Sequence, residues 1–491
     1  MAVKSSPSPG GNAVRSVALT GLSTVIVSGA AAAVGVILAR EFGRSAETDG
    51  FLAAYGVYLA IVIGAQAFRM VVVPELTRAA AAGRLADEAG AYLAALLVVA
   101  VPLSAVAVAA QGPLGEAITG SLPPESARLA GDALAWLVPA ALAQVLAAVA
   151  ASALAARDSY GVAALGYAAG AIAGVALFVA LLDRGLIALA WGVALNAAIT
   201  LGLPLTVLVA RVGLRPGTLR LGRRLWLLLQ GAATPLALQV TYLVGLRLAA
   251  DLDVGDVTTL SYAYLFAATL VAATASSVSL VTSAPLTRRG LDDASAAHHV
   301  VDGAWVSLVP VAAGAGVFAL AGERIVAGLL GNAYSGDVGR ELGHLVVWLA
   351  PWMLVTVAYS LTLPLLFVVR RAGRLVPLAA AVVVVHVPVA WAGRELLGLP
   401  GIALALAVSA AVVVGDMLLA ISPRALSLSL VGLARAGGVV AAAAAAAFGL
   451  GALAAGGTSG VVLGLVLFAG ILAASASLGL RQAWAYLRAL R

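Results

Sequence analysis

The chain has 491 residues, of which 63% are hydrophobic and only 10% are charged, whereas a soluble globular domain has about 25% charged residues. Its mean hydropathy is +1.07 and its formal net charge is +7. This composition excludes a water-soluble fold, a disordered chain and a collagen-like fibre, and the lack of cysteine excludes a disulfide scaffold. We therefore expect an all-α polytopic membrane protein without a sizeable soluble domain.

The first twelve residues, 1–12, are polar and rich in Pro and Gly, and we expect them to be disordered and cytoplasmic. The apolar run from Val17 to Leu38 is too long for a signal-peptide core of about 7–15 residues, so it is taken as the first span. A transmembrane helix needs about 20 apolar residues. By this criterion we expect about 14 transmembrane helices, at 13–40, 51–74, 91–110, 129–156, 160–182, 186–210, 225–249, 257–284, 300–321, 344–369, 375–392, 397–421, 430–454 and 460–480.

The basic residues test this arrangement. If the N-terminus is cytoplasmic and the spans alternate, 21 of the 29 Lys and Arg residues fall on the cytoplasmic side and 8 outside, as the positive-inside rule requires. Both termini then lie in the cytoplasm of a multi-pass protein of the bacterial inner (cell) membrane. This distribution, with Lys4 as the one lysine, indicates membrane topology rather than nucleic-acid binding.

An internal repeat divides the spans into two halves. Residues 72–78 read VVPELTR and residues 282–288 read TSAPLTR, six spans later. Six is an even number, so the two halves cross the membrane in the same direction, as a parallel repeat does. The expected divisions are an N-terminal lobe of six helices at 13–210, a basic cytoplasmic inter-lobe loop at 211–224, a pseudo-symmetric C-terminal lobe at 225–421, a C-terminal helix pair at 430–480 and a basic cytoplasmic tail at 481–491.

Polar side chains in the spans are candidates for a substrate cavity. Ser23 and Thr24 belong to a polar stripe on the first span, which suits either the wall of a water-filled cavity or a contact between helices through small residues. Arginines near span ends, such as Arg69 and Arg247, either face a cavity or extend to the interface. The candidate cavity residues are Ser23, Thr24, Arg40, Asp49, Tyr55, Gln66, Arg69, Gln239, Tyr242, Arg247, Tyr262 and Tyr264.

Two ionisable residues lie within neighbouring spans of the C-terminal half. His386 is in the middle of one span, and Asp416 lies about three-quarters of the way along the next. They are candidates for proton or ion coupling, or for a single hydrogen bond and an interfacial position. The sequence has no HExxH or P-loop motif. We therefore expect no catalytic residue, no metal and no cofactor.

Two stretches carry a resemblance to a known family. Residues 40–55 read REFGRSAETDGFLAAY and are followed by VVPELTR, which resembles the first two helices of the MviN/MurJ group of lipid II flippases, in the multidrug/oligosaccharidyl-lipid/polysaccharide (MOP) exporter superfamily. The matching residues are Arg40, Phe42, Gly43, Thr48, Asp49, Phe51 and Pro74. The resemblance implies a flippase that moves a polyprenyl-linked glycan precursor by alternating access, with spans 13 and 14 sheltering the lipid tail. It also implies a lipid-linked oligosaccharide as substrate, and membrane lipids and cell-wall synthesis enzymes as partners.

The chain departs from the family at the arginines that would hold the pyrophosphate. Val34 stands where the first helix of the family has arginine, and Tyr262 to Leu265 read Tyr-Ala-Tyr-Leu where the family has Tyr-Ala-Asp-Arg. A different lipid-linked cargo is one explanation. The alternatives are a small-molecule antiporter of the multidrug (MATE) type, and a non-transporting scaffold in cell-wall assembly. A membrane glycosyltransferase would usually have acidic residues in a large outer loop, and the outer loops here are short.

Overall fold

A computed structural model describes residues 9–157, 159–215, 217–272, 274, 292–369, 372–455 and 457–489. Throughout these residues the secondary structure consists of helices. Twelve of the helices are long and apolar enough to cross a membrane, or thirteen if the pair α12–α13, bent by 43°, is one span. The prediction of an all-α polytopic membrane protein is thus confirmed.

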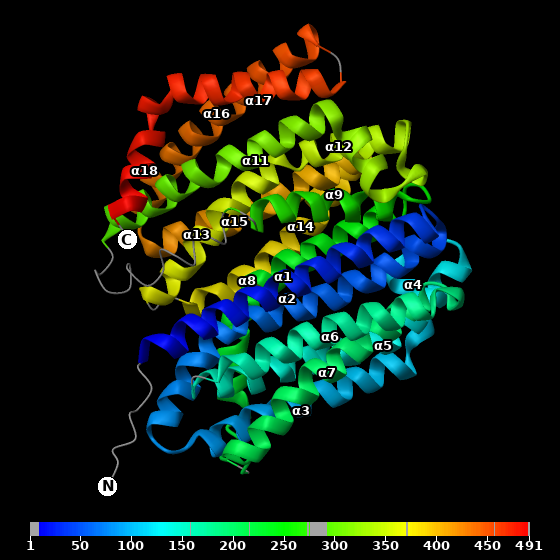
Figure 1. Cartoon of the computed structure of the whole chain (residues 1–491), viewed down its shortest axis with the longest axis vertical. Coiled ribbons are helices and arrows are strands. Elements are labelled where there is room, and N and C mark those ends of the chain that lie inside the picture. Colours follow the sequence, from blue (N-terminus) through cyan, green and yellow to red (C-terminus); the bar gives the residue numbers. More distant parts are fainter. Residues whose placement is uncertain are drawn as a thin grey trace. The chain divides into compact units, whose positions relative to one another are not determined.

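The chain divides into two compact units, Met1–Gln239 and Val240–Arg491 (Figure 1). The division lies within helix α8 (Leu221–Ala249) and not in the basic loop at 211–224. The limits of the two predicted lobes stay a prediction. The other helices of the first unit are α1 (Pro9–Phe42), α2 (Ala46–Ala81), α3 (Leu85–Ala109), α4 (Gln111–Thr119), α5 (Pro124–Ala155), α6 (Tyr160–Ala180), the short 3-10 helix η1 (Leu182–Arg184) and α7 (Ile187–Val212).

Helix α5 forms the centre of the first unit. It contacts α2, α3, α4, α6 and α7, and almost every residue from Leu137 to Leu154 is buried. Alanine and leucine occupy all sides of this helix, which is the pattern of a helix surrounded by others. The C-terminal part of α5 packs in a buried cluster with Tyr92 of α3, Leu208 of α7 and Leu228 of α8.

Small residues bring α6 and α7 close together. Gly166, Gly170 and Gly174 recur every fourth residue and so share one face of α6. A Cβ atom on Gly174 would lie 2.6 Å from the carbonyl oxygen of Gly192. Close approach of backbones through small residues is a usual way of packing helices in a membrane, where apolar side chains alone give no driving force.

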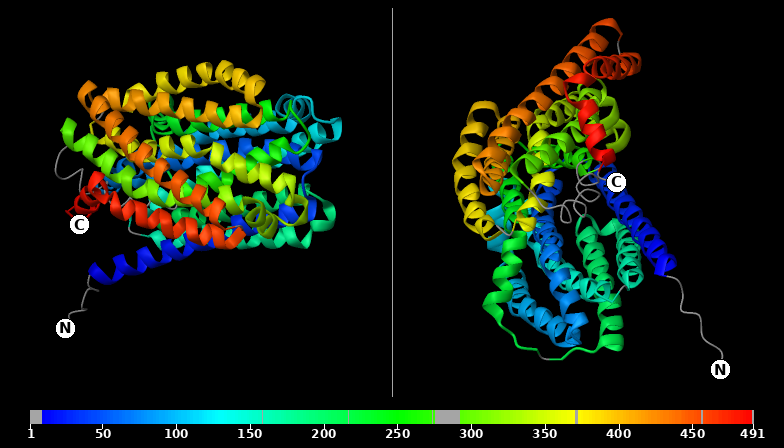
Figure 2. Two further views of the ribbon diagram at one scale, coloured as in Figure 1. Left: turned by 90° about the horizontal axis from the view of Figure 1, so that it is seen from above. Right: turned by 90° about the vertical axis from the view of Figure 1, so that its left-hand side faces the viewer.

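The second unit is built around α11 (Asp293–Leu330), which contacts α9, α12, α13, α16, α17 and α18. Figure 2 shows α16 and α17 side by side from two further directions. The remaining elements are α9 (Asp256–Val271), η3 (Asn332–Tyr334), α12 (Asp337–Trp348), α13 (Ala350–Val368), η4 (Ala372–Arg374), α14 (Leu375–Leu397), α15 (Leu399–Ile421), α16 (Pro423–Ala454), α17 (Gly457–Ala474), η5 (Ala476–Leu478) and α18 (Leu480–Ala489).

Thirteen of the fourteen predicted spans correspond to these helices, with the tenth formed by α12 and α13. The span expected at 257–284 begins as α9, and its second half, with the repeat motif at 282–288, lies outside the described residues. Helices α4 and α18 were not expected. They have 9 and 10 residues, which is too short for a search based on membrane-spanning length.

Candidate functional site

An aromatic cluster in the second unit contains two of the predicted cavity residues. The rings of Tyr242 on α8 and Tyr264 on α9 are stacked, with centroids 4.1 Å apart. Trp352 of α13 extends the cluster, 4.7 Å from Tyr264. The hydroxyl of Tyr242 lies 3.3 Å from that of Ser261. The cluster combines a large apolar face with hydroxyl groups, which is typical of sites that hold an amphipathic group.

Tyr262 lies on another face of α9. Residues two apart in a helix point in nearly opposite directions, and Tyr262 makes an edge contact with Tyr334 of η3, with ring centroids 5.5 Å apart. The structure therefore brings Tyr242 and Tyr264 together and places Tyr262 among other neighbours.

Arg247, near the end of α8, shares a carboxylate with a second arginine. Its Nη1 lies 2.6 Å from Oδ2 of Asp251, and Nη1 of Arg394, in the last turn of α14, lies 3.5 Å from the same oxygen. Arg394 also pairs with Glu395 at 2.8 Å. Two positive charges thus converge on one carboxylate. The sequence does not mark Arg394 as a site residue, because it is a single arginine at a span end, where an interfacial position is the ordinary explanation.

In the first unit, Ser23 takes part in a contact between helices. Its hydroxyl donates a hydrogen bond of 2.8 Å to the carbonyl oxygen of Ala164 on α6, and the residue is buried. This is the kind of contact that the second explanation of the polar stripe predicts, and the assignment of Ser23 to a cavity stays a prediction. The side chains of Thr24, Gln66 and Arg69 lie outside the described residues, so their assignment to a cavity stays a prediction.

The start of α2 is organised by its cap. The hydroxyl of Ser45 accepts a hydrogen bond from the backbone N–H of Thr48, as in other capped helices. Asp49 is fully buried in this first turn, where the helix dipole favours a negative charge. Further along α2, Tyr55 lies between Phe51 and Tyr58, with ring centroids 6.2 and 5.3 Å away.

The other two predicted cavity residues are Arg40 and Gln239. Arg40 is exposed in the last turn of α1, a position in which a positive charge complements the helix dipole. Gln239 is buried on α8. Their roles in binding stay predictions.

The two coupling candidates lie at different levels of the second unit. His386 is fully buried, and its Nδ1 shares a hydrogen bond of 2.7 Å with the hydroxyl of Ser409 on α15. Asp416 is seven residues beyond Ser409, or about 10 Å along the helix at about 1.5 Å per residue. The structure thus pairs His386 with Ser409, and Asp416 is half-buried without a hydrogen bond or ion pair to the part of the chain that the structure describes. A coupling role for either residue stays a prediction.

An apolar groove runs along the second unit. Its volume is about 400 Å³, and its walls come from α11, α12, α13 and α16. Leu308 and Ala315 of α11 face Ala441, Ala444 and Phe448 of α16 across it. The alanine run at 441–447 has little side-chain volume, so the groove stays open along this helix. The run is visible in the sequence, but it contains no polar side chain that would mark it as a site.

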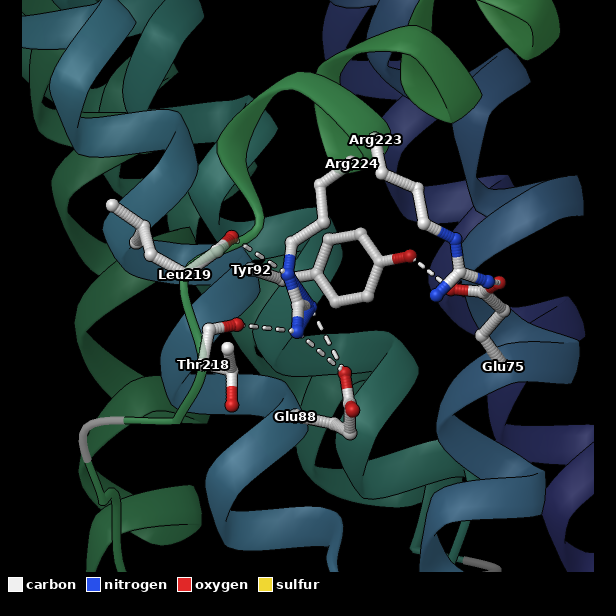
Figure 3. A network of polar contacts seen from close by, with 7 residues as sticks. All are labelled: Glu75, Glu88, Tyr92, Thr218, Leu219, Arg223 and Arg224. Carbon is white, nitrogen blue, oxygen red and sulfur yellow. Dashed lines mark hydrogen bonds and ion pairs between the residues drawn. The ribbon is translucent and has the colours of Figure 1, made fainter.

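A polar network lies at one end of the first unit (Figure 3). Arg224 is buried at the start of α8, and its guanidinium donates hydrogen bonds to Glu88 and to the carbonyl oxygens of Thr218 and Leu219. It also lies over the ring of Tyr92, 4.6 Å from the centroid. These contacts hold the loop before α8 against α3.

The same network includes a second carboxylate. The hydroxyl of Tyr92 donates a hydrogen bond to Glu75 at the end of α2, and Nη2 of Arg223 lies 3.6 Å from the other oxygen of Glu75. In the sequence this loop is a basic connection between the predicted lobes. The network cannot be predicted from it, because the two glutamates lie in other helices and have no motif.

Comparison with known proteins shows a likeness in fold. No family model and no curated protein sequence matches the chain. A structure of the lipid II flippase MurJ in the inward closed conformation matches 94% of this chain and 99% of its own, with a TM-score of 0.71 and 16% identity. The chain has the fold of MOP superfamily transporters. An inward-facing multidrug resistance MATE family transporter of that superfamily matches 83% of this chain and 94% of its own, with a TM-score of 0.66 and 17% identity.

An outward-facing MATE transporter also matches, over 86% of this chain and 96% of its own, with a TM-score of 0.56 and 16% identity. The predicted likeness to MurJ and the MOP superfamily is thereby confirmed at the level of fold. With identities this low, the likeness shows the fold and leaves the cargo to be argued from the chain's own residues.

Proposed function

We propose that this chain is a flippase that moves a polyprenyl-linked glycan precursor, lipid II or a related cell-wall or polysaccharide intermediate, across the bacterial inner membrane. The observation that carries the proposal is the apolar groove of the second unit, about 400 Å³ in volume. The tail of a polyprenyl-linked cargo stays in the hydrocarbon while the head group crosses, and a groove of this shape can hold the tail beside the protein. The MurJ-like fold supports the same function.

The groove contributes shape rather than hydrophobic affinity. Membrane lipid is as apolar as the groove, so transfer of a tail from one to the other has little hydrophobic driving force. Small side chains such as Ala441 and Ala444 leave space beside Phe448, and a flexible chain of methyl-branched units can fill it. A tail held in this position follows its head group across the membrane.

The polar head group needs other partners, because polar groups are costly in hydrocarbon. The stacked rings of Tyr242 and Tyr264 supply flat apolar surface and hydroxyl groups. Arg247 is paired with Asp251, and a guanidinium binds phosphate in the same two-pronged way as it binds carboxylate. In the proposed cycle Arg247 exchanges Asp251 for a phosphate of the cargo. Alternating access then exposes the head group to each side in turn, with both chain termini in the cytoplasm.

The groove can be tested by filling it. The protein is reconstituted in liposomes, and movement of a fluorescent polyprenyl-diphosphate glycan between leaflets is measured. Ala444→Trp places an indole in the groove, and we expect flipping at least tenfold slower. Ala446→Trp is the matched control, because Ala446 is exposed on the same helix and does not line the groove. Equal flipping rates in the two variants would show that the groove is not needed for flipping.

The cargo can be tested in cells. Depletion of the protein should cause a lipid-linked glycan to accumulate on the cytoplasmic leaflet. If no such lipid accumulates and the purified protein flips none, the flippase proposal fails. Co-purification with cell-wall synthesis enzymes would then support a scaffold.

A small-molecule antiporter is the second candidate. One observation favours it: Asp416 is a half-buried carboxylate in a membrane helix, and such residues often carry coupling ions. This function predicts that the chain protects cells from toxic cations and that Asp416→Asn removes the protection. Under the flippase proposal, expression of the chain gives no such protection.

A further inference from the structure

The network of Figure 3 borders a cavity of about 320 Å³, which we call the arginine pocket. It lies entirely within the first unit, where the end of α2, the start of α3 and the loop before α8 meet. Its charged lining consists of five arginines and two glutamates: Arg78, Arg84, Arg220, Arg223, Arg224, Glu75 and Glu88. Positive charge therefore exceeds negative charge by three.

Both glutamates are already engaged. Glu88 accepts two hydrogen bonds from Arg224, at 2.8 and 2.9 Å. Glu75 accepts a hydrogen bond from the hydroxyl of Tyr92, and Nη2 of Arg223 lies 3.6 Å from its other oxygen. The carboxylates thus neutralise the buried side of the network and leave the cavity side positive.

Two of the arginines have no partner for their charge among the described residues. The guanidinium groups of Arg84 and Arg220 are exposed at the cavity and make no hydrogen bond or ion pair with the described part of the chain. Within the described part of the chain, Arg223 has only its long contact to Glu75, and its side chain is 65% exposed. The guanidinium groups of Arg84, Arg220 and Arg223 are therefore available to a ligand. The guanidinium of Arg224 is occupied by its bonds to Glu88 and to the loop.

The walls of the pocket are held in place. A Cβ atom on Gly217 would lie 2.2 Å from the carbonyl oxygen of Asp87, and one on Gly90 would lie 2.3 Å from that of Arg215. The loop is thus packed directly on the first turns of α3. Arg220 has a φ of 31°, a conformation that costs a non-glycine residue about 1 kcal/mol or more and is often found at binding sites. The backbone of the loop is thus already in place, and binding needs to order only the arginine side chains.

The chemistry of the lining selects the ligand. Guanidinium groups bind phosphate through paired N–H donors, more strongly than neutral donors do. The cavity has space for about ten water molecules at about 30 Å³ each, which also accommodates a phosphate or diphosphate. The pocket lies where the apolar helices α3 and α8 begin, which is the level of lipid head groups. The predicted topology places it on the cytoplasmic side, where anionic lipids attract basic segments.

We infer that the arginine pocket binds a phosphate or diphosphate group carried by a lipid head group. Two lipids offer this chemistry: an anionic phospholipid of the bilayer and a polyprenyl diphosphate. The inference does not depend on transport, because binding at this pocket requires neither the groove nor flipping.

The test uses the full-length protein in nanodiscs of zwitterionic lipid. Binding of inorganic diphosphate is measured by calorimetry, and retention of phosphatidylglycerol or of a polyprenyl diphosphate is measured by native mass spectrometry. In the double variant Arg84→Gln/Arg220→Gln we expect at least tenfold weaker diphosphate binding and loss of the retained lipid. Glu88 and Arg224 are unchanged, so the fold should be kept, and thermal unfolding checks this.

The control removes the same charge elsewhere. Arg424→Gln/Arg435→Gln takes two exposed arginines from α16, on the same predicted side of the membrane, and should leave binding within twofold. Retention of phosphatidylglycerol identifies the bilayer as the source, and selective retention of the polyprenyl diphosphate identifies the cargo. Equal weakening in the two double variants, or no binding of any of the three probes by the native protein, would overturn the inference.

Discussion

Arg224 donates two hydrogen bonds to one carboxylate oxygen of Glu88, from a position 136 residues later in the sequence. The pair joins the start of α8 to the start of α3, and it fixes the intervening end of the basic loop through the carbonyl oxygens of Thr218 and Leu219. One arginine thus organises three segments of the first unit.

Removal of Glu88 should destabilise this end of the unit. Breaking a fully buried ion pair costs about 3–5 kcal/mol of stability. Because the side chain of Glu88 is 32% exposed, we expect Glu88→Ala to lower the free energy of unfolding by about 1–3 kcal/mol. The measurements are thermal unfolding in detergent and the rate of trypsin cleavage within 211–224. Glu116→Ala, an exposed glutamate on α4, is the control. A loop cleaved at the native rate in Glu88→Ala would show that the pair does not hold it.

The packing of α6 on α7 depends on Gly174. A methyl group there meets the backbone of Gly192 at 2.6 Å, and a backbone cannot move aside as a side chain can. Gly174→Ala should therefore cost about 1–3 kcal/mol, as overpacking does. Gly202→Ala on α7 is the matched control, because no atom lies within 4 Å of its added methyl group. Thermal unfolding of both variants decides the matter, and equal stability would argue against the close contact.

Arg247 and Arg394 should act as substitutes for each other. Each contacts Oδ2 of Asp251, so either single change to Gln leaves the carboxylate with one arginine. We expect each single change to lower the free energy of unfolding by less than about 1 kcal/mol, as for other partly exposed pairs. Unfolding by heat or denaturant measures this loss. The double variant should lose more unfolding free energy than the two single variants together, by about 0.5–3 kcal/mol.

Arg340 provides a comparison for that cycle. It pairs with Asp337 on α12, and both side chains are more than half exposed. Arg340→Gln should therefore leave unfolding unchanged. Additive losses at Arg247 and Arg394 would indicate that the two residues act separately.

The hydrogen bond between His386 and Ser409 should be a stability determinant. Both residues are buried, so Ser409→Ala leaves a ring nitrogen without its partner, at a cost of about 1–3 kcal/mol. Ser152→Ala is the control: Ser152 is also buried, but its hydroxyl bonds the Ala148 carbonyl of its own helix. Thermal unfolding should separate the two variants. Equal losses would show that the histidine pairing contributes nothing beyond removal of a buried hydroxyl.

Much of the fold could be predicted because the membrane restricts it. Long apolar runs had to be helices, and thirteen of the fourteen expected spans correspond to helices of the structure. Helix α12 was missed as a separate element because Asp337, Arg340 and Glu341 make its first turns polar. A search for apolar spans by hydropathy therefore includes only the apolar C-terminal part of α12, in the same span as α13.

The sites were less predictable, because they depend on contacts between distant segments. Tyr242 and Tyr264 were chosen for their polarity within a span, and the structure stacks them. The sequence contains no sign that Glu88 meets Arg224, since neither belongs to a motif. The groove was also missed, because it arises from volume that alanines leave empty, and a count of apolar residues treats an alanine like a leucine.

The pairing of Arg223 and Arg224 with Glu75 and Glu88 has a consequence for membrane insertion. Charges that orient a nascent chain act before the helices pack, when every arginine of the loop is still hydrated and unpaired. After folding, Arg224 has a close carboxylate partner in Glu88, and Arg223 keeps only a long contact to Glu75 among the described residues. Under the predicted topology, the same residues act as an orientation signal during biogenesis and hold the loop against α2 and α3 in the folded protein.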